Sequence, residues 1–133
     1  MSLTLGPHIL YSRSANELAQ FLSELLDMDI SAQANGSVFL QNGLFTLQVI
    51  QASPQALVAR NAERDTILSF RLDSLQALED LVLKVQFLSY RHGESQSSES
   101  DKKVKLHHQD DEYFFFLKDL DGRRWKFSFI SLT

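Results

Sequence analysis

The stretch ISAQANGSVFLQNGLFTLQVIQ, residues 30–51, contains the pairs Asn35-Gly36 and Asn42-Gly43. Asn-Gly is the preferred pair in two-residue hairpin turns, because both central positions adopt a positive φ there. The pairs separate three strand-like runs, at residues 30–34, 37–41 and 44–51. We therefore predict a three-stranded antiparallel meander in this part of the chain.

A short strand and a helix precede the meander, at residues 8–12 and 14–27. Ser14 and Glu17 have the spacing of a capping box, in which both side chains satisfy free N–H groups of the first helical turn. One apolar stripe follows at helical spacing: Leu18, Phe21, Leu22, Leu25 and Leu26. We expect the helix to end near Asp27, because aspartate tolerates the left-handed conformation. The order of the first half is thus β-α-β-β-β.

The second half repeats this order. A strand is predicted at residues 66–72, and Asp73, with Gln76 at the capping-box position, begins a helix. The apolar stripe of this helix is Leu75, Leu78, Leu81, Val82 and Val85. Three further strands are predicted at residues 87–91, 113–118 and 123–130, and a turn at residues 119–122 joins the last two.

The repeat predicts the fold class, because one βαβββ half cannot bury its sheet alone. We predict an α+β fold with a single domain over residues 1–133 and modules at 5–52 and 65–133. The two modules form a curved mixed sheet around a cleft, with the helices on the outer face. Residues 53–64 form a connector, and residues 93–112, rich in Ser, Asp, Glu, Lys and His, form a long polar loop.

Composition excludes several classes of function. The 133 residues carry a net charge of -4 and no cysteine. An acidic balance argues against an obligate nucleic-acid-binding protein. The absence of cysteine excludes disulfides, thiolate zinc sites and cysteine nucleophiles. No apolar run approaches the length of a membrane span and no secretory signal is visible, so we expect a cytoplasmic protein.

Strand alternation predicts a ligand-binding face. In the last strand Trp125, Phe127 and Phe129 point to the core, and the alternate side chains point to the cleft. The predicted cleft residues are His8, Leu10, Ser12, Gln48, Ile67, Ser69, Arg71, Arg124, Lys126 and Ser128. This set favours a polar or anionic small molecule, with three cations as donors. The alternatives are a solvated sheet face or ion pairs with a partner subunit.

Three motifs resemble the vicinal oxygen chelate superfamily, which includes glyoxalase I, extradiol dioxygenases, fosfomycin-resistance enzymes and bleomycin-binding proteins. They are PHILYS at residues 7–12, FLSELLDMDI at residues 21–30 and KDLDGRRWKF at residues 118–127. The resemblance implies paired βαβββ modules and a homodimer. In metal-dependent members it implies ligands on the first and last strands of each half, at positions matching His8, Gln48, Ile67 and Lys126. Isoleucine cannot coordinate a metal, and a protonated lysine repels one.

These departures favour a metal-free member that binds a small molecule in its cleft. They favour a non-catalytic role over an enzymatic one but leave the question of catalysis open. One alternative is a divalent-metal-dependent lyase, isomerase or dioxygenase with an altered ligand set based on His8 and Gln48. Another is a non-catalytic module that binds a protein partner through the loop at residues 93–112. We interpret His107 and His108 as part of that polar loop and not as a metal site. Adjacent side chains of a strand point to opposite faces, so both rarely reach one ion.

Overall fold

The computed structural model describes residues 2–34, 36–53, 55, 67–91 and 104–131. The chain divides into two compact units, Met1–Ala62 and Glu63–Thr133. Most of the predicted connector and residues 93–103 of the predicted loop lie outside the described residues. Each unit contains one mixed four-stranded sheet and a helix, which confirms the α+β prediction. None of the described helices is long and apolar enough to cross a membrane.

The first unit consists of β1 (His8–Ser12), α1 (Ala15–Leu26), β2 (Asp29–Ala34), β3 (Ser37–Gln41) and β4 (Thr46–Gln51). The strand order is β1-β4-β3-β2. β1 and β4 are parallel, and β2, β3 and β4 form the antiparallel meander predicted from the two Asn-Gly pairs. Both glycines of these pairs have a positive φ, which glycine adopts without steric cost.

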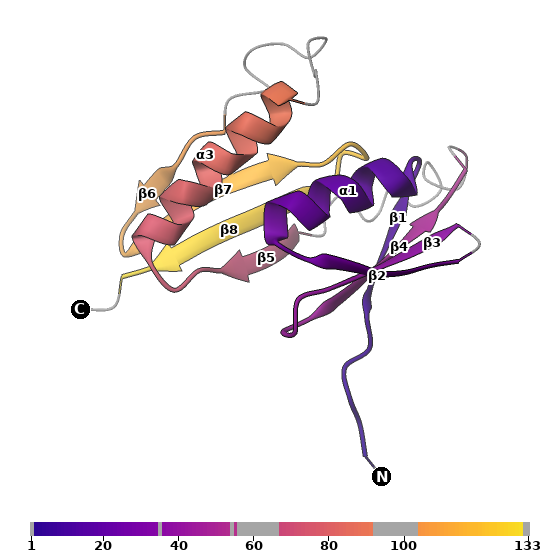
Figure 1. Ribbon diagram of the computed structural model, residues 1–133. Coiled ribbons are helices and arrows are strands. Elements are labelled where there is room, and N and C mark those ends of the chain that lie inside the picture. Colours follow the sequence, from indigo (N-terminus) through magenta and orange to yellow (C-terminus); the bar gives the residue numbers. More distant parts are fainter. Residues whose placement is uncertain (1, 35, 54, 56–66, 92–103, 132–133) are drawn as a thin grey trace. The chain divides into compact units, whose positions relative to one another are not determined.

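The second unit consists of β5 (Ile67–Arg71), α3 (Leu75–Arg91), β6 (His107–Gln109), β7 (Glu112–Lys118) and β8 (Arg124–Ile130). Its strand order, β5-β8-β7-β6, repeats that of the first unit, again with the first and last strands parallel. Figure 1 shows α3 running across one face of this sheet. The predicted internal repeat is therefore present in both connectivity and strand order.

Each helix packs on one face of its own sheet. In the first unit the buried apolar residues are Leu10, Ala15, Leu18, Ala19, Leu22, Leu25, Met28, Val38, Leu40, Leu47 and Val49. In the second they are Leu78, Val85, Leu88, Phe115, Leu117, Trp125 and Phe127. Phe70 stacks on both Trp125 and Phe127, with centroid distances of 5.9 and 5.7 Å. Burial of each large side chain stabilises the fold by about 1.5–3 kcal/mol.

The predicted capping boxes are wrong, although both helices begin where expected. Ser14 makes no side-chain cap hydrogen bond. Instead its own N–H donates to Ser12 Oγ at 3.0 Å, and Ala15 N–H donates to Gln51 Oε1 at 2.9 Å. In α3 the capping oxygen comes from Ser74, which accepts the Ala77 N–H at 3.1 Å. A strand neighbour or an adjacent serine thus satisfies the free N–H groups.

The predicted strand at residues 87–91 is also wrong, because α3 continues through it. Leu78, Val85 and Leu88 are buried at intervals of seven and three residues, which places them on one face of a helix. Phe87 is 59% exposed on the other side. The first strand of the meander is instead β6, inside the predicted polar loop, and the left-handed Asp110 lies in the turn that connects it to β7.

Candidate functional site

The second sheet has an open face, defined here as the face of β5, β7 and β8 opposite Trp125 and Phe127. Residues paired in register point to the same side of a sheet. Ser69 pairs with Lys126, Arg71 pairs with Ser128, and Ile67 pairs with Arg124. The strand register thus brings five predicted residues of this module to one face, as alternation indicated: Ser69, Arg71, Arg124, Lys126 and Ser128. Ser128 is only 2% exposed, so the polar surface comes from the others.

The predicted face of the first sheet is wrong by one residue in β1. Leu10 and Ser12 are 3% and 0% exposed, on the side that α1 covers. His8 lies on the same face of β1, because it precedes Leu10 by two residues. Gln48 pairs with Ile9 and points to the opposite side. The Ser12 hydroxyl is used to receive the N–H group at the start of α1. The residues that share a face with Gln48 are Ile9 and Tyr11, which sequence reasoning missed.

This register bears on the alternative metal site. His8 and Gln48 lie on opposite faces of the sheet, so they cannot ligate one ion together. The Lys126 ammonium lies 3.3 Å from both carboxylate oxygens of Glu112. Across the part of the chain that the structure describes, no group of three or more His, Asp or Glu side chains is placed to hold a metal ion. The described candidates His8 and Gln48 therefore do not form a shared metal site.

On the open face, aromatic rings of β7 lie beside cations of β8. Arg124 lies 5.9 Å from the centroid of Phe116, and the Lys126 ammonium lies 5.1 Å from that of Phe114. The two rings meet edge to face with centroids 5.7 Å apart. His107 stacks on the far side of this row, 5.4 Å from Phe114. Phe116 is 39% exposed, so the row reaches solvent.

The open face is strongly cationic in an acidic protein. Its described charged residues are Arg71, Lys118, Arg124, Lys126 and Glu112. Glu112 forms an ion pair with Lys126, and both side chains are about one-third exposed or less, at 31% and 26%. Lys118 stands directly opposite Arg124. Sequence reasoning missed Lys118, Phe114 and Phe116. They occupy the positions of β7 that alternate with the buried Phe115 and Leu117, which places them on this face.

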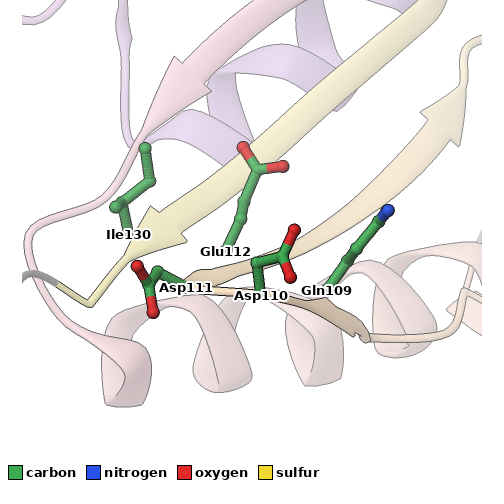
Figure 2. Close-up of a pocket in the computed structure, with 5 residues that line it drawn as sticks. All are labelled: Gln109, Asp110, Asp111, Glu112 and Ile130. Atoms are coloured by element: carbon green, nitrogen blue, oxygen red, sulfur yellow. The ribbon is translucent and has the colours of Figure 1, made fainter.

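A depression of about 300 Å³ lies at the N-terminal end of β7, around the turn that joins it to β6. Its lining residues are Gln109, Asp110, Asp111, Glu112 and Ile130. Figure 2 shows the carboxylates of Asp111 and Glu112 pointing away from each other. The depression is acidic, and Glu112 and Lys118 lie at the two ends of β7, roughly 20 Å of strand apart. An anion is therefore attracted to the other end of the open face.

No family model and no curated protein sequence matches the chain. Solved structures do match over nearly its whole length. A hypothetical protein from S. aureus is 19% identical, with a TM-score of 0.66 over 97% of this chain and 95% of that one. FosX, a fosfomycin resistance protein from Listeria monocytogenes in complex with Mn(II) and sulfate, is 13% identical, with a TM-score of 0.68 over 99% and 94%.

A lactoylglutathione lyase from Agrobacterium tumefaciens is 14% identical, with a TM-score of 0.64 over 97% of this chain and 95% of that chain. Identities this low establish the fold and leave the chemistry to be argued from the site. The chain therefore has the paired βαβββ fold of these solved structures, the fold that its three sequence motifs predict.

Proposed function

We propose that this protein binds a small anionic molecule on the open face of the second sheet. The observation that carries this proposal is the ratio of four cations to one carboxylate among the described charged residues of that face. Because Glu112 pairs with Lys126, the positive charge of Arg71, Lys118 and Arg124 stays available to a ligand. Hydrogen bonds between ionised partners contribute about 1.5–3 kcal/mol each.

We propose further that binding needs no metal ion. The Listeria FosX holds 1S,2S-dihydroxypropylphosphonic acid together with Mn(II) in one of its structures. In this chain the cationic side chains would supply the positive charge that a metal supplies elsewhere, and Lys126 would repel a divalent cation. We favour binding and sequestration over catalysis, because the described charged residues of the open face are four cations and one carboxylate that is already paired with Lys126.

The anion-binding proposal is tested by thermal unfolding with a panel of anions: sulfate, phosphate, benzoate and citrate. A ligand at one hundred times its Kd stabilises the folded state by about 2.7 kcal/mol, which gives a clear rise in Tm. Arg124→Gln should abolish the rise. Lys105→Gln is the matched control, since Lys105 is an exposed cation outside the open face. The proposal fails if no anion raises the Tm or if the two variants respond alike.

Metal independence needs a separate measurement. We expect protein purified without chelator to carry no stoichiometric metal, and its Tm and anion affinity to be unchanged by EDTA or added Mn(II). A lower Tm in EDTA together with stoichiometric metal would favour the alternative of a metal-dependent lyase, isomerase or dioxygenase.

A homodimer remains a proposal implied by the superfamily resemblance. A cytoplasmic location remains a proposal based on the sequence. Light scattering at several protein concentrations measures the oligomeric state directly. The alternative role as a protein-interaction module depends on residues 93–112, most of which lie outside the described part of the chain, and it stays a prediction. Deletion of residues 95–103 should leave anion binding intact if the open face is the site.

A further inference from the structure

We infer that the ligand is a planar aromatic anion whose acidic group binds between Lys118 and Arg124 and whose ring stacks on Phe116. This inference rests on the proposed function and names the class of ligand. It is carried by two observations on neighbouring positions of β7 and β8: two cations placed directly opposite each other, and a partly exposed phenyl ring beside them.

The cation pair is the first observation. Lys118 and Arg124 are cross-strand neighbours in the β7–β8 register, a spacing of about 4.5–5.5 Å between Cβ atoms. Like charges at directly opposite positions destabilise a sheet. Within the described chain, no carboxylate forms an ion pair with either of them. A carboxylate or phosphate bound between the two side chains accepts hydrogen bonds from both and removes the repulsion.

The exposed ring is the second observation. Phe116 precedes Lys118 by two residues on the same face, about 7 Å along the strand. It is 39% exposed, with Phe114 against it edge to face and Arg124 at 5.9 Å. An aromatic ring gains most from an offset stacked or edge-to-face neighbour. A single-ring carboxylate anchored at the cations reaches this ring, whereas a bare inorganic anion leaves it exposed to water.

Lys126 has a different environment. Glu112 compensates its charge at 3.3 Å, and its ammonium lies over Phe114 on the side of the row away from Lys118. The cation that matched the missing metal ligand is thus held within the protein. The charge of the ligand is recognised instead by Arg124, which precedes Lys126 by two residues in β8.

The test compares benzoate with cyclohexanecarboxylate, which carries the same charge on a puckered ring of similar size. Binding is followed by amide chemical shifts of the ¹⁵N-labelled full chain. We expect benzoate to bind about 2- to 10-fold more tightly, the range for an aromatic pair. Phe116→Leu should remove this preference and leave cyclohexanecarboxylate affinity unchanged. Lys118→Gln and Arg124→Gln should each weaken both ligands by about tenfold or more.

Two controls match these variants: Phe87→Leu, at a 59% exposed ring on α3, and Lys105→Gln. Both should bind like the parent protein. Equal affinity for the two carboxylates, or a benzoate preference that persists in Phe116→Leu, overturns the inference and leaves the anion-binding function standing. Failure of sulfate and of both carboxylates to bind overturns both. Shift changes confined to residues 109–112 would also refute the inference, because they place the ligand at the other end of β7.

Discussion

A conservative substitution of Asp119 should strongly lower the stability of the second unit. The Asp119 carboxylate is fully buried and accepts four hydrogen bonds. Oδ1 accepts the backbone N–H groups of Asp121 and Arg123 at 2.9 and 3.1 Å. Oδ2 accepts Arg123 Nη1 at 2.8 Å and the indole Nε1 of Trp125 at 2.9 Å. One carboxylate therefore holds the β7–β8 turn, an arginine and the largest core side chain.

Asp119→Asn keeps the shape of the side chain and replaces one acceptor oxygen by an N–H₂ donor. Whichever way the amide turns, two donors of the protein then face another donor. Each lost hydrogen bond to a charged group costs about 1.5–3 kcal/mol, so the two lost bonds should cost about 3–6 kcal/mol in the free energy of unfolding. For a chain of this size that lowers Tm by roughly 10–20 °C.

Urea unfolding followed by tryptophan fluorescence measures this loss directly, because Trp125 is the only tryptophan of the chain. Asp110→Asn is the matched control. Asp110 is exposed and has a left-handed backbone with a φ of 54°, a conformation that asparagine tolerates. The free energy of unfolding of this variant should therefore differ from that of the parent protein by less than about 0.5 kcal/mol. If Asp119→Asn also changes the free energy of unfolding by less than about 0.5 kcal/mol, the reasoning from the four hydrogen bonds is refuted.

Three further substitutions test other parts of the fold. Gln51→Ala removes the side chain that accepts Ala15 N–H and donates to Arg13 O, and it should cost about 1–2 kcal/mol in urea unfolding, with the helical circular dichroism retained. Gly43→Ala adds a Cβ that meets no atom within 4 Å at a φ of 90°, so only backbone strain of about 1–2 kcal/mol should lower the Tm; no change would show that the turn relaxes. Val85→Ala, at a fully buried position of α3, should cost about 2 kcal/mol by calorimetry, and a smaller loss than at the exposed Leu83 would contradict the assigned helix face.

Local signals predicted the first unit well. The Asn-Gly pairs act over two residues and the apolar stripe of α1 over twelve, so both are visible in the sequence. Asp27 ends α1 in the left-handed conformation, as expected, with a φ of 52°. The bounds of β1 and β3 agree with the predicted ones.

The second unit was harder because its signals are ambiguous. Residues 87–91, FLSYR, fit a short strand by composition, but Leu88 completes a buried stripe with Val85 and so continues α3. β6 consists of three exposed polar residues, His107–Gln109, which carry no strand pattern of their own. Only pairing with β7, across a two-residue turn at Asp110 and Asp111, makes this segment a strand.

The sequence by itself determined the repeated order of elements and, through alternation, which side chains of a strand share a face. Only the tertiary structure decided which of the two faces of β1 the helix α1 covers, and it buried Leu10 and Ser12 where a cleft was expected. It also placed Glu112 beside Lys126 and Lys118 opposite Arg124. The physical reason is that period-two alternation divides a strand into two faces without naming them, whereas helix packing and cross-strand register, which join residues distant in sequence, decide their surroundings.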